Sequence, residues 1–227
     1  MLRAEKIAKK YKHQPVLQDA SIDVNSEIKA LIGINGSGKS TFLKIIAGIV
    51  SSDQGSVILN GVDVSSLPPE KRNLGYVPQH PALFRHLTVK ENILYGMRNG
   101  KGTMEAYERV VEMLGLKDVL HKKPRELSGG YKSRASLARS LVPEPGVLLM
   151  DEPLGGMDVV VKEKILPVFR NVLKELQVPV LYVTHDPKEA ELLADSFAII
   201  DDGAVRDVDS SEQAFSLIRS SILKVYE

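Results

Sequence analysis

The sequence predicts an α/β protein in which a mainly parallel sheet forms the core, with a small antiparallel β-subdomain beside it and a helical subdomain inserted into it. Three short apolar runs are typical of buried parallel strands: residues 28–32, the four residues that begin at Val147, and residues 180–184. Residues 1 to about 27 alternate between polar and apolar side chains, which predicts antiparallel strands. Between roughly residues 83 and 142 the periodicity is mostly helical, which predicts the inserted subdomain.

Local signals place the remaining elements of the first half. The stretch from Gly55 to Gly61 predicts a hairpin-like strand that ends in a turn, and Asn73 to Gln79 predicts a return to the main sheet. A helix is expected from Ser40 to Val50, directly after the first apolar run. We divide the single domain of residues 1–227 into three parts, with bounds 1–82, 83–142 and 143–227.

The last third of the chain carries two helix signals. Helical spacing recurs from Val159 to Leu176, although Pro167 lacks an N–H group and is expected to kink or break that helix. Ser210 with Gln213 resembles a capping box, which predicts the start of a final helix.

Composition limits the classes of function. At 227 residues and 43% hydrophobic, the chain is long enough to bury a substantial core as one domain. Its 26% charged residues and net charge of +1 predict an ordinary surface and no nucleic-acid partner. The absence of cysteine excludes disulfides and thiolate zinc sites. No apolar run approaches bilayer length and the first residues lack the layout of a secretion signal, so we expect a cytoplasmic location.

A glycine-rich motif follows the first apolar run and reads Gly33-Ile-Asn-Gly-Ser-Gly-Lys39-Ser40. It satisfies G-x-x-x-x-G-K-[ST], and its glycines allow backbone N–H groups to approach the phosphates of a nucleotide. Lys39 is expected to reach the terminal phosphates, and the Ser40 hydroxyl is expected to bind Mg²⁺. The alternative is a glycine-rich turn that only joins strand to helix, and the Lys-Ser pair with both flanks in place disfavours it.

Two carboxylates, Asp151 and Glu152, follow the apolar run at Val147. A parallel strand would deliver them to the carboxyl edge of the sheet, where ligands bind in open α/β folds. One carboxylate can hold Mg²⁺, and the other can orient or deprotonate a water molecule. Taken alone, the pair fits a solvated loop equally well, and the matching context favours the site.

His185 follows the third apolar run and is predicted to lie at the same edge of the sheet. There it could donate a hydrogen bond to the γ-phosphate. A lone histidine is more often structural or solvent-facing, and we interpret the four other histidines in that way (His13, His80, His86 and His121).

Ser128-Gly129-Gly130 precedes an amphipathic stretch and is therefore expected at a helix N-terminus, which attracts anions. An ordinary serine cap is the simple alternative. Because Lys39 already serves the chain's own nucleotide, we predict that this second turn closes over ATP bound by another copy.

In their order along the chain, these motifs resemble the nucleotide-binding subunit of an ABC transporter, and the resemblance covers nearly the whole length. In that family Gly33 to Thr41, which includes Asn35, Gly36, Ser37, Gly38, Lys39 and Ser40, is the Walker A motif. Gln79 is the Q-loop residue, and Leu127 to Gly130 is the signature. The resemblance implies a P-loop NTPase (RecA-like) core with antiparallel and helical subdomains.

The same resemblance assigns the remaining site residues. Val147 to Glu152 corresponds to Walker B with its catalytic glutamate, Asp158 to the D-loop aspartate, and His185 to the switch histidine. Tyr11, ahead of Val16, resembles the aromatic residue that stacks on adenine, and both are expected to contact the nucleotide.

The implied mechanism needs two subunits, each of which completes the other's ATP site. Glu152 is expected to act as base or to position water, His185 to stabilise the γ-phosphate, and Gln79 to contact Mg²⁺ and the interface with membrane subunits. Ser40, Gln79 and Asp151 are the expected Mg²⁺ contacts. The implied partners are transmembrane permease subunits and, indirectly, a solute-binding protein, at the cytoplasmic face of the cell membrane.

Two departures from the family pattern fall on contacts between subunits. The signature ends in Tyr131 where Gln or Glu is usual, and we expect this side chain to face away from the turn. The D-loop contains Gly155 and Gly156, which are expected to loosen the loop and to alter the rate of hydrolysis more than the fold.

The sequence after Gln79 resembles importers of the molybdate, sulfate, spermidine and maltose groups. Tyr95-Gly96-Met97, Lys164 to Pro167 and Val180 to Val183 have close parallels in molybdate and tungstate ATPases. These segments do not contact the transported ion, so the inference is by association. Importers of sulfate, polyamine or sugar, and a regulatory module with weak hydrolysis, remain alternatives. We also expect no direct feedback by an oxyanion through a further domain of this chain.

Overall fold

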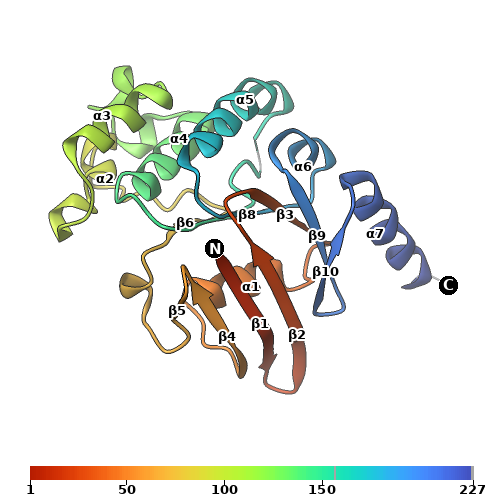
Figure 1. Cartoon of the computed structure of the whole chain (residues 1–227). Coiled ribbons are helices and arrows are strands. Elements are labelled where there is room, and N and C mark those ends of the chain that lie inside the picture. Colours follow the sequence, from red (N-terminus) through yellow and green to blue (C-terminus); the bar gives the residue numbers. More distant parts are fainter. Residues whose placement is uncertain (156, 226–227) are drawn as a thin grey trace.

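The computed structural model describes residues 1–155 and 157–225, and its centre is a six-stranded sheet in the order β10-β9-β3-β8-β7-β6. Its strands are β3 (Ile28–Ile32), β6 (Gly75–Val77), β7 (Leu148–Asp151), β8 (Val180–Thr184), β9 (Ser196–Asp201) and β10 (Ala204–Val208). Neighbours from β9 to β6 are parallel, and β10 pairs antiparallel with β9 (Figure 1). The mainly parallel core predicted from the sequence is therefore confirmed.

A second sheet of four strands lies beside the first in the order β2-β1-β4-β5. Its strands are β1 (Leu2–Tyr11), β2 (Gln14–Val24), β4 (Gln54–Leu59) and β5 (Val62–Asp63), and all of its pairs are antiparallel. This confirms the antiparallel β-subdomain and the hairpin that was expected near Gly55.

Seven α-helices surround the sheets in the described part of the chain. They are α1 (Lys39–Ile46), α2 (Val89–Ile93), α3 (Met104–Met113), α4 (Gly129–Leu141), α5 (Val159–Leu176), α6 (Pro187–Leu193) and α7 (Ser211–Val225). Short 3₁₀ helices occupy Pro69–Lys71, Met97–Asn99, Lys117–Val119 and Pro124–Glu126. Helices α2 to α4 form a group at one end of the molecule, and α7 lies at the opposite end (Figure 1).

The central sheet separates two apolar cores because successive side chains of a strand point to opposite faces. On β8, Tyr182 belongs to one core and Leu181 and Val183 belong to the other. The first core contains the apolar faces of α3, α4, α5 and α6, and the second contains α1 and the antiparallel sheet. The sheet is therefore covered on both sides, and its functional edge lies where the strands end.

Helix α1 ends at Ile46, so the predicted end at Val50 is wrong. Arg72 donates hydrogen bonds to the carbonyl oxygens of Ile45 and Ile46 at 3.0 and 2.9 Å, which satisfies the last turn of the helix. Gly48 then takes a left-handed φ of 76°, where a Cβ atom would lie 2.4 Å from Arg72 Nε. A residue 26 positions further along the chain thus closes this helix.

Pro167 lies inside α5 but does not break it. The proline removes one helical hydrogen bond, which leaves the carbonyl of Glu163 without its usual donor. Both residues are exposed, so water can serve that carbonyl group. The helix meanwhile buries Ile165, Leu166 and Phe169, and this packing keeps it continuous.

Ser210 caps α7 as predicted, because its Oγ accepts the N–H of Gln213 at 3.1 Å. The reciprocal bond differs slightly from a regular capping box: the Gln213 side chain accepts the N–H of Asp209 at 2.7 Å, one residue earlier.

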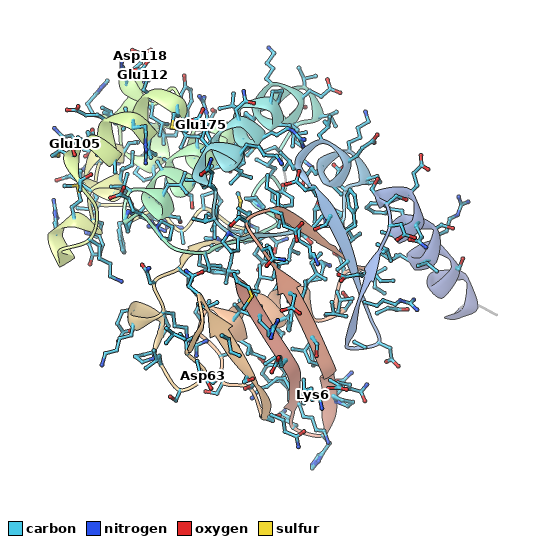
Figure 2. The ribbon with its side chains drawn as sticks, viewed as in Figure 1. Lys6, Asp63, Glu105, Glu112, Asp118 and Glu175 are labelled. Carbon is cyan, nitrogen blue, oxygen red and sulfur yellow. The ribbon has the colours of Figure 1, made fainter. Side chains whose placement is uncertain are left out.

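Exposed charged side chains lie both on the helical group and on the antiparallel sheet (Figure 2). Glu105, Glu112 and Asp118 lie exposed around α3, while Lys6 and Asp63 lie exposed on the antiparallel sheet. Within the described residues, no helix combines the length and the apolar character that crossing a bilayer requires.

Candidate nucleotide site

The phosphate loop joins β3 to α1 and forms one wall of a cavity of about 560 Å³. Gly38 is the N-cap of α1 and has a φ of 99°, which a residue with a Cβ atom rarely adopts. The N-terminus of α1 therefore opens toward the cavity with its free N–H groups, and the helix dipole favours an anion there. The lining residues are Tyr11, Val16, Asn35, Gly36, Gly38, Lys39, Ser40, Thr41, Gln79, Glu152 and His185.

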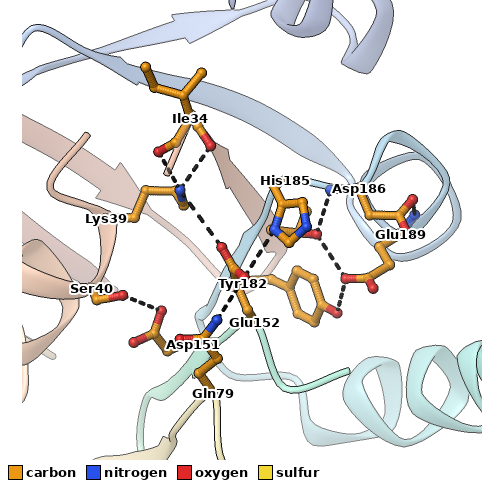
Figure 3. A network of polar contacts seen from close by, with 12 residues as sticks. Ile34, Lys39, Ser40, Gln79, Asp151, Glu152, Tyr182, His185, Asp186 and Glu189 are labelled. Atoms are coloured by element: carbon orange, nitrogen blue, oxygen red, sulfur yellow. Dashed lines mark hydrogen bonds and ion pairs between the residues drawn. The ribbon is translucent and has the colours of Figure 1, made fainter. Parts of the chain in front are cut away.

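Lys39 is 5% exposed and lies at the bottom of the loop. Its Nζ donates hydrogen bonds to the carbonyl oxygens of Gly33 and Ile34 at 2.8 and 2.7 Å, and lies 3.7 Å from Glu152 Oε1 (Figure 3). Burial lowers the pKa of Lys39, while the nearby Glu152 and Asp151 carboxylates oppose that shift. A triphosphate at this position would supply further negative charge and favour the ammonium form.

Asp151 ends β7 and is only 3% exposed. Ser40 Oγ donates a hydrogen bond to its Oδ1 at 2.9 Å, and the Tyr76 hydroxyl donates to its Oδ2 at 3.2 Å. Burial raises the pKa of Asp151, and the hydrogen bonds from Ser40 and Tyr76 counteract this effect. The same environment raises the pKa of Tyr76, mainly through burial.

The Ser40 and Asp151 pair fits Mg²⁺ by its chemistry, since a hydroxyl and a carboxylate present oxygen ligands to a hard cation beside the phosphate loop. Across the described residues, no group of three or more acidic, histidine or cysteine side chains is arranged to hold a metal. A Mg²⁺ ion here would therefore complete its coordination with phosphate oxygens and water, as is usual for nucleotide sites.

Glu152 stands at the centre of the cavity, and the sequence gives no hint of how tightly it is held. It is 6% exposed and has a left-handed φ of 44°. Its Oε2 accepts the amide Nε2 of Gln79 at 3.1 Å and lies 2.9 Å from His185 Nδ1. Its backbone N–H donates to Val183 O at 3.0 Å, so the strained residue is tied to β8.

His185 follows β8 and approaches Glu152 across the open side of the cavity. Its side chain is 52% exposed, in contrast with the 7% exposure of the Glu152 side chain. A ring at this position can contact both Glu152 and a ligand that enters from solvent. The structure thus brings Lys39, Gln79, Glu152 and His185 together from four separate segments of the chain.

Tyr11 lies at the end of β1 and lines the cavity with Val16. Its ring is exposed, and Lys9 Nζ lies 5.6 Å from the ring centroid. An exposed aromatic face next to an apolar side chain provides a surface on which a planar base can stack.

The turn at Ser128 lies outside this cavity. Ser128 is the exposed N-cap of α4, and within the described residues its side chain makes no capping hydrogen bond. Gly130 presses against α5, because a Cβ atom there would lie 2.7 Å from Ile165 Cδ1. The turn therefore presents a helix N-terminus to the outside of its own chain.

Asp158 also lies outside the cavity, where its side chain accepts the N–H of Val160 at 2.9 Å and caps α5. The N–H of Gly155 donates to Glu152 O at 2.9 Å, so this part of the loop is tied to the backbone of Glu152. Gly156 falls outside the described residues.

Tyr131 was expected from the sequence to face away from the turn, and in the structure it packs against the core. Its side chain is half-buried against the core that contains α4 and α5, and the guanidinium of Arg134 lies 4.3 Å from its ring centroid. Tyr131 is one turn C-terminal to the N-cap, so helix geometry directs its ring onto the neighbouring helices.

Sequence reasoning missed Tyr76, whose hydroxyl shares Asp151 with Ser40. The available signal was its position three residues before Gln79, in a strand that pairs with the strand of Asp151. It also missed the contribution of Ser133, whose Oγ donates to Pro153 O at 3.0 Å and so joins the signature helix to the segment after Glu152.

Comparisons with known proteins agree with this arrangement. The sequence profile of the family described as ABC transporter matches residues 17–155. A molybdate/tungstate import ATP-binding protein from Pyrococcus abyssi is 44% identical over 221 residues, which are 95% of this chain and 64% of the relative. A sulfate/thiosulfate import ATP-binding protein from Synechocystis is 36% identical over 214 residues, which are 92% of this chain and 60% of the relative.

A solved structure supports the fold as a whole. It is described as the dimeric, post-hydrolysis state of an ATP-binding cassette bound to ADP and Pi. It superimposes with a TM-score of 0.80 at 28% sequence identity and covers 92% of this chain and 98% of the other. The chain spans less than two thirds of the length of the two relatives above.

Proposed function

This chain belongs to the ABC transporter family, and from that premise we propose that it is the ATP-binding and ATP-hydrolysing subunit of an importer. The observation that carries the proposal is the convergence of Lys39, Glu152 and His185 on one cavity, with the Ser40 and Asp151 pair beside them. A phosphate-binding cation, a carboxylate held next to an imidazole, and an oxygen pair for a metal are the groups that ATP hydrolysis needs.

The residues would act in a defined order. The phosphate loop and Lys39 bind the β- and γ-phosphates and hold the γ-phosphate toward Glu152. Glu152 then orients a water molecule and accepts its proton, while His185 donates a hydrogen bond to the γ-phosphate and supports Glu152 from the other side. Ser40 and Asp151 would hold Mg²⁺, which supplies neutralisation of phosphate charge when it is bound.

A second copy of the chain would complete each site. The Ser128 turn opens away from the chain's own cavity, and its free helix N-terminus suits a γ-phosphate held by another subunit. The relative with bound ADP and Pi is dimeric, which supports the same arrangement here. Asp158, exposed at the start of α5, would contribute to the contact between copies.

We place the subunit at the cytoplasmic face of the cell membrane, bound to permease subunits. The relatives are described as import ATP-binding proteins, and this supports the direction of transport. A solute-binding protein would act on the other side of the membrane and contact this chain only through the permease.

We propose a molybdate- or tungstate-type oxyanion as the solute: the molybdate/tungstate relative is 44% identical, while a sulfate/thiosulfate relative reaches 39% and a spermidine/putrescine relative 38%. The test is to purify the chain with its membrane partner, reconstitute the complex in vesicles and measure ATP turnover with each solute. Stimulation of ATP turnover by molybdate or tungstate alone supports the proposal. Stimulation by sulfate, spermidine or maltose would identify that compound as the solute instead. Absence of turnover with every solute would favour a regulatory module instead.

A further inference from the structure

Glu189 in α6 is a buried carboxylate that the mechanism above does not use. It is 2% exposed, and three donors surround it. The hydroxyls of Tyr182 and Thr184 both donate to Oε2 at 2.8 Å, and Lys162 Nζ lies 2.6 Å from Oε1. A buried carboxylate with this many partners holds a fixed position, because moving it would leave each donor unpaired.

Lys162 comes from a different element, the first turn of α5, and it joins two acids of the segment around His185. Its Nζ also donates to Asp186 Oδ2 at 3.0 Å, and its side chain is 15% exposed. Burial tends to lower the pKa of Lys162, but the bonds to Glu189 and Asp186 outweigh burial and raise it. Burial likewise tends to raise the pKa of Asp186, and Lys162 reverses that shift.

Both neighbours of His185 are anchored by this cluster. Thr184 Oγ1 donates to Glu189 and accepts the N–H of Asp186 at 3.0 Å. Asp186 Oδ1 accepts the N–H groups of Lys188 and Glu189 at 3.0 and 3.4 Å, which caps α6. His185 itself projects from between the two anchored residues toward Glu152, as Figure 3 shows.

We propose that Lys162 and Glu189 are positioning residues, which hold the backbone on either side of His185 so that its ring meets Glu152. The proposal rests on the proposed function, since it assumes that His185 supports hydrolysis. Lys162 lies one turn after Asp158, so the pair also connects the segment around His185 to the N-terminal end of α5.

A purely stabilising role explains the cluster less well. Buried ion pairs contribute little net stability compared with apolar packing of the same size, because both charges must first lose their hydration. Apolar contacts already hold α5 and α6 against the core through Ile165, Phe169, Ala190 and Leu193. The ion pair between Lys162 and Glu189 is better explained as fixing the direction of the backbone around His185.

The test compares ATP turnover by the full chain, alone or with its co-purifying membrane partner, for Lys162→Met, Glu189→Gln, Lys162→Arg and His185→Ala. We expect Lys162→Met and Glu189→Gln to lower kcat about tenfold with KM for ATP within about twofold, because the phosphate loop is untouched. Lys162→Arg retains a cation and should keep most of the turnover. In a His185→Ala background, Lys162→Met should cause no further loss.

Lys174→Met is the matched control. Lys174 also lies on α5 and pairs with an acid, Asp195, but at the far end of the helix from His185. Its kcat should stay within about twofold of the parent chain. Thermal unfolding of each variant separates loss of fold from loss of positioning, and Glu189→Gln preserves side-chain volume if Lys162→Met is unstable.

Two results would overturn the proposal. The first is a decrease in kcat on Lys162→Met that is equally large in the parent chain and in the His185→Ala background. The second is an equally large decrease in kcat on Lys174→Met. If His185→Ala alone leaves kcat unchanged, His185 does not support hydrolysis, and the proposed positioning role of Lys162 and Glu189 fails with it. If His185→Ala lowers kcat but Lys162→Met and Glu189→Gln do not, only the positioning role fails.

Discussion

The cavity at Lys39 and the turn at Ser128 both present a helix N-terminus to an anion, yet they differ in how the chain uses them. Lys39, Asp151 and Glu152 are buried, and all three have partners within the chain. Lys39 is bonded to its own loop and lies near Glu152, while Asp151 accepts hydrogen bonds from Ser40 and Tyr76. Ser128 is exposed, and within the described residues its side chain makes no capping bond. The side chains of the first site are held by partners within their own chain, whereas the second site presents a helix N-terminus to the outside.

Because of this difference, substitutions in the two regions should have different effects on ATP binding and turnover. Changes in the cavity should alter nucleotide binding or chemistry in each copy by itself. Changes at the turn should leave binding intact and alter only the step that needs a second copy.

Glu152→Gln should have the largest effect and lower turnover by about 10²–10⁴, because a general base contributes that range. Gln retains a similar shape, so ATP should still bind and two copies should stay closed around it. Turnover and sedimentation with ATP measure the two consequences, and Glu163→Gln on the surface of α5 is the control. A Glu152→Gln chain that stays monomeric at saturating ATP would contradict the two-copy site.

Lys39→Ala should weaken ATP binding roughly 10- to 150-fold, since a hydrogen bond to a charged group contributes about 1.5–3 kcal/mol. Titration of the chain with a fluorescent ATP analogue measures this change. Lys44→Ala, an exposed lysine on the same helix, should keep its affinity within about twofold. Equal affinities of Lys39→Ala and the parent chain would rule out Lys39 as a phosphate ligand.

Ser128→Arg should lower turnover about tenfold or more while ATP affinity stays within about twofold. The long side chain would occupy the turn and exclude the second copy's phosphate, but the turn does not line its own cavity. The comparison predicts this split between binding and turnover. Normal hydrolysis by Ser128→Arg would remove the turn from the mechanism, and Arg125→Ala in the preceding 3₁₀ helix serves as a control for nearby surface changes.

Tyr131→Gln should have the smallest effect on turnover, within about threefold. The substitution removes the ring's contact with Arg134 and part of its packing on the core, so unfolding free energy should fall by about 1 kcal/mol. Urea denaturation measures stability, and ATP turnover measures function. A large loss of turnover with unchanged stability would mean that Tyr131 belongs to the contact between copies.

Much of the fold could be predicted because its signals are local. Strands β3, β7 and β8 are continuous apolar runs, and the antiparallel sheet alternates, so fold class and element order followed from spacing. The end of α1 was predicted wrongly because a distant residue intervenes: Arg72 closes α1 before Val50. Buried packing of Ile165 and Phe169 keeps α5 continuous through Pro167.

The candidate site divides in the same way. Spacing alone placed Lys39 and Ser40 on a strand, turn and helix, and it placed Asp151, Glu152 and His185 after strands. It could not say that Tyr76 would share Asp151, that Glu152 would adopt a positive φ, or that Tyr131 would be half-buried. These three features depend on tertiary contacts between segments, and a single sequence does not specify those contacts directly.

The sequence by itself determined the order of the elements and the chemistry offered at each strand end, because backbone preferences and hydrophobic periodicity act between near neighbours. Only the tertiary structure decided that Lys162 and Glu189 would hold the residues beside His185, and that the Ser128 turn would open away from its own cavity. The reason is burial: when the helices pack on the sheet, each buried polar group must find a partner from whatever segment lies nearest.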